Sequence, residues 1–490
     1  MLLLLVSALV IGYLIVQRVD KWHRLRHITG PRWCAWTDIW MLRRSWSGSL
    51  YEDLGKLHQE HGPNYVICGD PNEVRRMWGV RSEWDRSPWY KGFQLDPPRD
   101  CTLSMRDNAL HATLRSKLAP GYSGKGIESL HESIDAQIAK FIRLIESKYL
   151  STDTNLRPVD FARKVQYLTL DVISTLAFGH TFGFLDKDGD LFNYIKTTEE
   201  SLPVMQMITL CRGCITKAVV AERYGPHKIT KPDMLGSFVA NGLSQKEAEA
   251  ESLVQIIAGS DTTATTLRTG ILLLTTSSKV YTTLLTEIDT AISENHISNP
   301  VTDAEAHALP YLQACIKECF WFWPLITGIM LHMCPWEADV CGVSIPAGMN
   351  VGWSAWAVLR DKVVFGGVAE LERECEGDRE RLIEMERAVE LLFGQGKWGC
   401  LGKPISLLEI NKVFVELLRR FDFAVLNPGA PDGDVLIRRL DAVGAVYEDI
   451  TSYEDAQRYT GHEHAKLIVA DCLLRMECYC SRLINCDNAT

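Results

Sequence analysis

One cysteine of this chain, Cys400, has neighbours that suit metal chemistry. Gly394, Gly396 and Gly399 precede it, so the backbone can adopt positive φ there and lie close against a flat group. A helical apolar pattern begins at Leu401, which places the cysteine at a helix N-terminus. Amide dipoles at such a position lower the pKa of a thiol, and the resulting thiolate is a metal ligand. The alternative is a buried structural cysteine after a glycine-rich turn.

A second candidate stretch is a polar run inside the helix predicted over residues 246–274. From Ala258 to Thr263 it reads A-G-S-D-T-T. Glycine and short polar side chains are poor helix formers, and the polar ones compete with the helix for backbone hydrogen bonds. Local violations of this kind usually mark function. The alternative is a polar helix face that carries hydroxyl groups by chance.

Two basic side chains occur at helical spacing in a third stretch, residues 106–125. His111 and Arg115 are four residues apart and therefore share one helix face, where they can hold one anion between them. A solvated basic face is the alternative.

Helices supply most of the frame for these side chains. Further helices are predicted over about 127–149 and 159–178, and another begins at Leu401. Short strands are predicted around Met330, Val340 and Val351.

The three candidate stretches resemble motifs of the cytochrome P-450 family. Residues 393–402 match its haem-ligand pattern F-x-x-G-x-x-x-C-x-G, residues 258–263 its A-G-x-D-T-T motif, and residues 106–125 its propionate-binding helix. The resemblance covers roughly residues 2–442 and is to fungal, membrane-anchored members, such as pisatin demethylases and benzoate hydroxylases. It implies the cytochrome P-450 fold, mainly α with a small β region, plus an N-terminal transmembrane helix.

The resemblance also implies a site for haem b with an axial thiolate. Cys400 would ligate the iron, and a thiolate ligand favours O–O cleavage. Asp261 and Thr262 would relay protons, while the helix loosens beside the haem and Gly259 leaves room for dioxygen. The residues implied to contact the cofactor are His111, Arg115, Ala258, Gly259, Phe393, Gly396, Lys397 and Gly402.

The implied function is a monooxygenase reaction that inserts one oxygen atom of dioxygen into a lipophilic small molecule. Electrons come from NADPH through a separate NADPH-cytochrome P-450 reductase. We expect this reductase to dock where Lys397, Lys403 and Lys412 offer a basic surface. A role in fungal secondary metabolism is an expectation by association.

Two positions depart from the family pattern. Trp398 stands where an Arg or His usually reaches a haem propionate, and Lys397 beside it offers a substitute charge. Trp321 stands where the E-x-x-R arginine pairs with Glu318. A tryptophan cannot replace the five donors of a guanidinium, and an unpaired buried carboxylate costs several kcal/mol.

The segment that should complete this Glu–Arg cluster also departs. The family has an aromatic-Pro-Glu-Arg motif there, but no proline occurs between Pro346 and Pro404. Arg373 or Arg379 are the candidate substitutes. These departures support an alternative function, a non-catalytic cytochrome P-450-like membrane protein with impaired haem binding. A faulty gene model would produce the same departures.

Composition excludes some classes of partner. The chain has 490 residues, 46% of them hydrophobic and 23% charged, which is ordinary globular composition. Its net charge of −10 argues against nucleic acid as a partner. Its fifteen cysteines show no disulfide framework, which favours a reducing compartment. Neither the C-x-x-C pair at Cys211 nor the histidines and cysteines beyond residue 460 have the usual context of a redox or zinc site.

The N-terminus predicts a membrane anchor over residues 1–22. Residues 2–16 are apolar apart from Ser7, basic residues follow, and no cleavage site of small residues is present. The positive-inside bias places the rest of the chain in the cytosol, as in a single-pass protein of the endoplasmic reticulum.

Three segments follow this anchor. Residues 23–50 contain a Gly30-Pro31 hinge and tryptophans suited either to the membrane interface or to a core. Residues 51–443 are predicted to form the catalytic domain, and residues 444–490 a divergent C-terminal tail.

Overall fold

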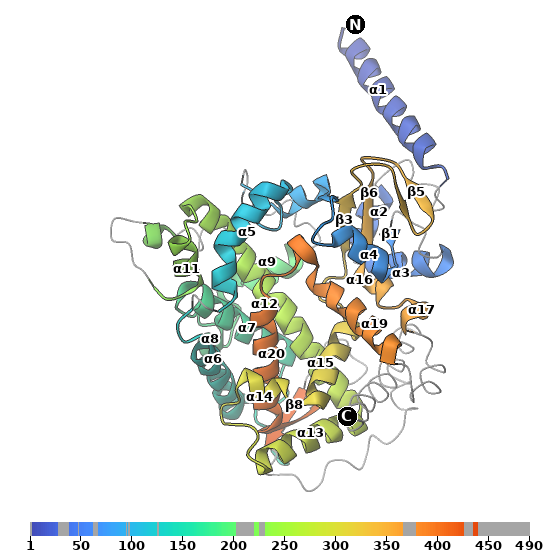
Figure 1. The fold of residues 1–490 in the computed structure, drawn as a ribbon. Helices are drawn as coiled ribbons and strands as arrows, with labels where there is room; N and C mark the ends of the chain where they lie inside the picture. The colour runs from blue at the N-terminus through green and yellow to red at the C-terminus, as the bar shows by residue number, and fades with distance from the viewer. Residues whose placement is uncertain are drawn as a thin grey trace.

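The computed structural model describes residues 2–27, 39–47, 49–61, 67–94, 96, 99–124, 127–201, 220–224, 231–365, 379–425 and 435–439. The helices are α1 (Leu2–Leu25), α2 (Ile39–Trp46), α3 (Leu50–His61), α4 (Pro71–Trp78), α5 (Asn108–Tyr122), α6 (Leu130–Leu144), α7 (Phe161–Phe178), α8 (Phe184–Lys187), α9 (Tyr194–Ser201), α11 (Met234–Ala240), α12 (Gln245–Thr276), α13 (Ser278–Ser293), α14 (Asp303–His307), α15 (Pro310–Phe322), α16 (Ala355–Val358), α17 (Lys362–Phe365), α19 (Arg379–Glu390) and α20 (Lys403–Leu418). Short 3₁₀ or π turns are η1 (Pro88–Phe93), η2 (Ile145–Tyr149), η3 (Leu191–Asn193), η5 (Leu391–Phe393) and η6 (Gly396–Trp398). The strands are β1 (Ile67–Cys68), β2 (Asp85–Arg86), β3 (Ile329–Met333), β4 (Ala338–Val340), β5 (Val343–Ile345), β6 (Asn350–Ser354), β7 (Phe421–Val425) and β8 (Val435–Arg439). The predicted class, mainly α with a small β region, is confirmed (Figure 1).

Helix α12 runs through the middle of the helical part (Figure 1) and packs against α7, α15 and α20. Ser244 and Glu247 form a reciprocal capping box at its start. At Gly270 an added Cβ would lie 2.3 Å from Phe414 of α20, so glycine is needed for this close approach. The predicted helix over 246–274 is therefore confirmed. It is one continuous α-helix, however, and the expected loosening at the polar run is not seen.

The β region consists of a four-stranded sheet and two hairpin-like pairs. The sheet has the order β1-β6-β3-β2, in which only the β1–β6 pair is parallel. Strands β4 and β5 pair antiparallel, as do β7 and β8. In the β2–β3 register, Arg86 lies opposite His332. This cross-strand pair lies against Trp398, in the loop that carries Cys400.

The buried apolar side chains form one contiguous core from Cys68 to Ile437. A second, small cluster consists of Leu54, Ile329 and Leu331, and Trp40 packs against it. Trp40 is therefore a packing residue, which favours the core interpretation for this tryptophan. Trp33 and Trp36 lie outside the described residues, as do Cys211, Cys214, Arg373 and the tail at 444–490.

Helix α1 extends away from the remainder of the molecule (Figure 1). Its C-terminal end contacts the β5–β6 connection, where Arg24 donates to the Ala347 carbonyl at 3.0 Å. Among the described residues no helix has the length and hydropathy that crossing a membrane requires. The transmembrane helix predicted over residues 1–22 is therefore not confirmed.

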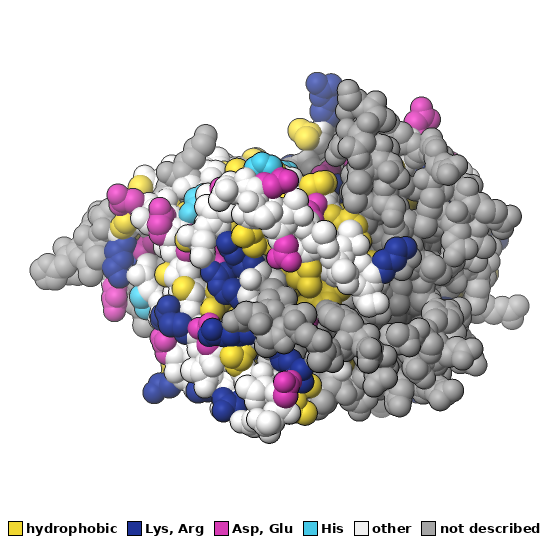
Figure 2. All heavy atoms as spheres, turned by 90° about the horizontal axis from the view of Figure 1, so that it is seen from below, with side chains coloured by type: hydrophobic (Ala, Val, Ile, Leu, Met, Phe, Trp, Pro, Cys, Tyr) yellow, Lys and Arg dark blue, Asp and Glu magenta, His cyan; other side chains and the backbone are white. Residues whose placement is uncertain are grey.

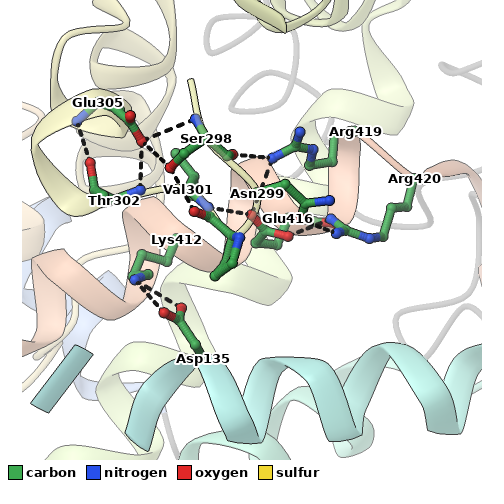
Figure 3. A network of polar contacts seen from close by, with 11 residues as sticks. Asp135, Ser298, Asn299, Val301, Thr302, Glu305, Lys412, Glu416, Arg419 and Arg420 are labelled. Atoms are coloured by element: carbon green, nitrogen blue, oxygen red, sulfur yellow. Dashed lines mark hydrogen bonds and ion pairs between the residues drawn. The ribbon is translucent and has the colours of Figure 1, made fainter. Parts of the chain in front are cut away.

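A polar network joins α20 to the segment that precedes α14 (Figure 3). Glu416 accepts the Val301 N–H at 2.8 Å and forms ion pairs with Arg419 and Arg420. One turn earlier on α20, the Lys412 side chain is only 2% exposed.

The buried ammonium of Lys412 has its own partner on a neighbouring helix. Lys412 Nζ lies 2.8 Å from Oδ1 of Asp135 on α6 (Figure 3). Lys412 was predicted to form part of a basic docking surface, and this prediction is wrong. The helical pattern did not reveal that a carboxylate of α6 faces this position.

Charged side chains of both signs lie interspersed on the described part of the face shown in Figure 2. Surface pairs include Lys140 of α6 with Asp186 at 2.9 Å. Exposed pairs of this kind contribute at most about 1 kcal/mol, because water and salt screen them. The Asp135–Lys412 pair differs, since its cation is buried.

Asp135→Ala should lower the free energy of unfolding by about 3–5 kcal/mol, because it leaves the Lys412 ammonium buried without its counter-charge. Adding Lys412→Met should restore most of this loss, since the apolar side chain needs no partner. Urea unfolding followed by circular dichroism measures both changes. Asp186→Ala is the matched control, because it removes the partner of Lys140, an exposed lysine on the same helix as Asp135. A cost of Asp135→Ala no larger than the control's would contradict this account.

Candidate haem site

Cys400 lies in a tight loop between η6 and α20. Gly394 and Gly396 have φ of +68° and +59°, the left-handed region that favours glycine. A Cβ at Gly396 would also lie 2.7 Å from the carbonyl oxygen of Trp78 in α4. The Cys400 N–H donates to the Phe393 carbonyl at 2.6 Å and closes the loop. The loop therefore requires glycine at two of the predicted positions.

The Cys400 thiol is exposed, yet the protein around it raises its pKa by desolvation. The backbone N–H groups of Gly402 and Lys403 hydrogen-bond the sulfur and oppose this rise, as does the charge of Arg115. Amides at the start of α20 thus favour the thiolate as predicted, but burial outweighs them. A metal cation bound at the sulfur would lower the pKa of this thiol, because a coordinated thiol is deprotonated. This donor set therefore fits metal ligation.

Helix α12 borders the Cys400 loop. Thr263 Oγ1 lies 3.0 Å from Ser406 Oγ, which is on α20 six residues after the cysteine. Ala258 is exposed, although Ile256 and Ser260 on either side of it are buried. An exposed residue within a buried helix marks a space beside that helix. The exposed Ala258 and Cys400, on elements joined by the Thr263–Ser406 contact, fit a flat cofactor between them.

Gly259 and Thr262 of this helix differ in what they contact. A Cβ at Gly259 would lie 2.8 Å from Ile173 of α7, so packing against α7 explains this glycine. That Gly259 also leaves room for dioxygen stays a prediction. Thr262 Oγ1 donates to the Ala258 carbonyl at 2.8 Å, within the helix.

Asp261 points toward α7. Its Oδ1 accepts a long hydrogen bond of 3.4 Å from Nε2 of Gln166, a residue that is itself buried. Burial raises the pKa of Asp261, and the charge of Arg268 partly opposes the rise. This carboxyl group consequently holds a proton more readily than an exposed aspartate does.

His111 and Arg115 lie on α5, which Asp107 caps by accepting two backbone N–H groups at 2.9 Å. His111 is 1% exposed, and its Nε2 has no hydrogen-bond partner among the described residues. Burial, with the charges of Arg86 and Arg115, lowers the pKa of His111 to about 3. The predicted pair therefore combines a neutral buried imidazole with a guanidinium near the sulfur.

Trp398 lies at the centre of a basic cluster. Its ring is 4.3 Å from that of His111, and the Arg86 guanidinium stacks over it at 4.1 Å. Trp398 Nε1 and both ring nitrogens of His332 are buried without a hydrogen-bond partner in the described part of the chain. The Trp398 N–H and the one N–H of a neutral His332 are donors beside positive charge, and such a site fits an anionic group such as a carboxylate.

Sequence reasoning missed Arg86 and His332. Arg86 lies in a two-residue strand without periodic pattern, so nothing in its neighbourhood marked it. A histidine within the apolar strand β3 was the only signal for His332. Lys397, which was predicted to replace the charge lost at Trp398, donates to the Ser82 carbonyl at 3.1 Å. The Arg86 guanidinium, 4.1 Å from the Trp398 ring, lies closer to it than the Lys397 ammonium, whose Nζ is 5.4 Å away.

Phe393, also predicted to contact the cofactor, is buried beneath the loop. Its ring meets Phe320 of α15 edge-on at 5.3 Å. The Lys403 ammonium lies 5.3 Å from the centroid of the Phe393 ring and 3.2 Å from Glu390. The loop is thus anchored on α15 and α19.

Trp321, which replaces the E-x-x-R arginine, is 3% exposed on α15. Its Nε1–H donates to the Leu359 carbonyl at 2.6 Å, and its ring packs 6.1 Å from Phe365. Glu318, one turn earlier, is also buried. Arg373 and the side chain of Arg379 lie outside the described residues. Trp321 therefore joins α15 to the α16–α17 connection through apolar packing and one hydrogen bond.

Comparison with known proteins agrees with this site. A profile of the family described as cytochrome P-450 matches residues 215–434. The chain is 37% identical to the cytochrome P-450 monooxygenase ABA1 of Pyricularia oryzae, over 87% of this chain and 92% of that protein. It is 31% identical to the cytochrome P-450 monooxygenase aba1 of Botryotinia fuckeliana, over 86% and 93%. A third relative, the cytochrome P-450 monooxygenase mpaDE of Penicillium brevicompactum, is 26% identical over 86% of this chain and 54% of its own length.

The helical fold, the Cys400 loop and these identities define one class of protein. This chain belongs to the cytochrome P-450 family, as its motifs predicted. Family membership implies a monooxygenase that uses haem with thiolate ligation.

Proposed function

We propose that this protein is a haem-thiolate monooxygenase that inserts one oxygen atom of dioxygen into a lipophilic small molecule. The observation that carries the proposal is the environment of Cys400, an exposed thiol with two backbone N–H donors at its sulfur. Haem b bound there would supply the redox chemistry that side chains lack. Electrons would come from NADPH through a separate reductase. The fungal sources of the relatives support a role in fungal secondary metabolism.

The basic cluster around Trp398 would hold the haem propionates. His111 and Arg115 are the predicted pair, and Arg86 adds a guanidinium at 4.1 Å from the Trp398 ring. A carboxylate placed there would accept from the orphaned indole N–H of Trp398, and its negative charge would favour protonation of the His111 imidazole. Arg86 of strand β2 would thereby supply the positive charge that family members usually carry at the position of Trp398.

Asp261 would hold and pass a proton at the site, with Thr262 as its hydroxyl neighbour. Gln166 donates to Oδ1 of Asp261, which leaves Oδ2 to carry the proton. The raised pKa keeps this proton available closer to neutral pH than in an exposed aspartate. Gln166 thus orients the carboxyl group from α7.

A specific observation favours the alternative function, a non-catalytic relative that binds haem poorly. Trp321 is buried with its N–H satisfied by Leu359, so this part of the core is built without the family's arginine. The two functions differ in one measurable property, which is whether the protein binds haem through Cys400.

The absorption spectrum of the purified protein, reduced and exposed to carbon monoxide, separates the two. We expect a thiolate-type Soret band that Cys400→Ala abolishes, because no other ligand is expected to supply a thiolate there. Cys334→Ala, at a buried cysteine outside the site, should keep the band. Absence of haem in the unmodified protein, or a band unaffected by Cys400→Ala, would exclude the monooxygenase proposal.

Arg86→Leu should speed haem loss to an excess of apomyoglobin by about 10–100-fold, since hydrogen bonds to charged groups contribute about 1.5–3 kcal/mol. The variant keeps a side chain of apolar bulk but removes the guanidinium over Trp398. Arg99→Leu is the control, because Arg99 belongs to the same segment and pairs with Asp96 and Glu249 instead. Equal rates of haem loss for both variants, with the fold retained, would remove Arg86 from the cofactor site.

We further propose that α1 attaches the protein to the surface of a membrane, with the endoplasmic reticulum as its compartment. Leu9, Tyr13 and Val16 are exposed apolar side chains of this helix, and Arg18 and Arg24 follow them. Such a helix binds anionic lipid through apolar burial and charge. Deletion of residues 1–25 should abolish sedimentation with vesicles that contain phosphatidylserine. Unchanged sedimentation would place membrane attachment elsewhere.

A further inference from the structure

Two cysteines far apart in the sequence meet at the edge of the β region. Cys68 ends strand β1 and is fully buried, while Cys341 lies in the turn between β4 and β5 and is partly exposed. Their sulfur atoms are 3.8 Å apart. The proposed function uses neither residue, and the Cys400 loop contains neither.

The turn that carries Cys341 holds its sulfur against Cys68. Cys341 has φ of +52°, which is rare for a residue other than glycine, and Gly342 follows at +79°. Asp339 accepts the Gly342 N–H at 2.9 Å and fixes this left-handed turn. The backbone geometry of this turn therefore holds Cys341 in place beside Cys68.

The two thiols are chemically unequal. The hydrogen bond between the two sulfurs, together with burial, raises the pKa of Cys68, whereas the same hydrogen bond lowers the pKa of Cys341. The nearby carboxylates of Asp70, Glu73 and Asp339 oppose this lowering. Cys341 is also the one that solvent reaches, so it is the thiol that meets an oxidant first.

We propose that Cys68 and Cys341 form a reversible disulfide when the protein meets a peroxide, making this pair a redox modification site. The sulfurs must approach by about 1.8 Å to reach bonding distance. Rotation of the partly exposed Cys341 side chain provides this movement without displacing the buried strand β1.

The chemistry balances with hydrogen peroxide as the oxidant. The Cys341 thiolate attacks one peroxide oxygen, so that an S–O bond forms, the O–O bond breaks and hydroxide leaves as water after taking up a proton. Cys68 then attacks the sulfenic sulfur of Cys341, an S–S bond forms, and a second water leaves. Two electrons pass from the thiols to the peroxide. A dithiol reductant then reduces the disulfide back to the two thiols.

A metal-binding role suits this pair less well. Among the residues that the structure describes, no group of three or more His, Cys, Asp or Glu side chains could hold a metal ion. Two thiols alone leave a zinc ion without its remaining ligands. Oxidation needs only the two sulfurs and access to one of them.

The bond would tie the β4–β5 hairpin to the four-stranded sheet. Strand β1 pairs with β6, and helix α4 begins directly after it, where Asp70 caps the helix with Pro71 in its first turn. The far end of α4 is Trp78, whose carbonyl lies against Gly396 of the Cys400 loop. The disulfide therefore stiffens the element on which that loop rests.

Peptide mapping of the full chain tests the proposal. The reduced protein is treated with one equivalent of hydrogen peroxide, its free thiols are alkylated, and the digest is analysed by mass spectrometry with and without dithiothreitol. We expect one linked peptide that joins residues 68 and 341, with two fewer hydrogen atoms, and its loss on reduction.

Single variants separate a disulfide from ordinary thiol oxidation. In Cys68→Ser the second step cannot occur, so Cys341 should accumulate as a sulfenic acid that dimedone labels. Cys341→Ser should show neither the link nor the label, and Cys341→Ala on the exposed turn replaces it if that variant folds poorly. Cys101→Ser, at a buried cysteine elsewhere, should leave the link unchanged. Oxidation of Cys341 in the unmodified protein without the linked peptide, or a pair that stays reduced while other thiols react, would overturn the proposal.

Discussion

The partial desolvation of the Cys400 sulfur by the protein packed around this exposed residue is the constraint on which the rest of the site depends. Burial raises the pKa of this thiol, so the chain must supply whatever favours the thiolate from its own groups. It does so with the N–H groups of Gly402 and Lys403 and with the charge of Arg115. The two N–H groups reach the sulfur because the loop turns tightly into α20, which explains the left-handed glycines before it. The part of the free-energy cost of the thiolate that these groups leave uncompensated would be offset by a metal cation bound at the sulfur.

The same site shows how a fold keeps a charge when a sequence position changes. Trp398 cannot bind a carboxylate through a cationic group, but its ring lies beneath the Arg86 guanidinium. That guanidinium also donates to the carbonyls of Thr102 and Leu103, which fixes its position over the ring. A stacked arginine on a neighbouring strand thus supplies charge at the place where a side chain of the loop usually does.

Predictions succeeded where one short segment carries its own physical requirement. Positive φ in the Cys400 loop is confirmed at Gly394 and Gly396 but not at Gly399, because glycine spacing anticipates left-handed backbone without fixing which glycine adopts it. Predictions failed where a residue's neighbour comes from a distant element. Lys412 was expected on an exposed basic surface, but it is buried and paired with Asp135 of α6. A helical period identifies the face of a helix, but it does not identify what lies against that face.

The sequence by itself determined the family, the mainly helical class and the candidate ligand Cys400, because local motifs and periodicity encode these features. Only the tertiary structure decided which charges gather around Trp398, since Arg86 and His332 meet there through strand pairing. It likewise brought Cys68 and Cys341 together across most of the chain. Contacts between distant segments depend on how the elements pack, and no local pattern in a single sequence records that packing.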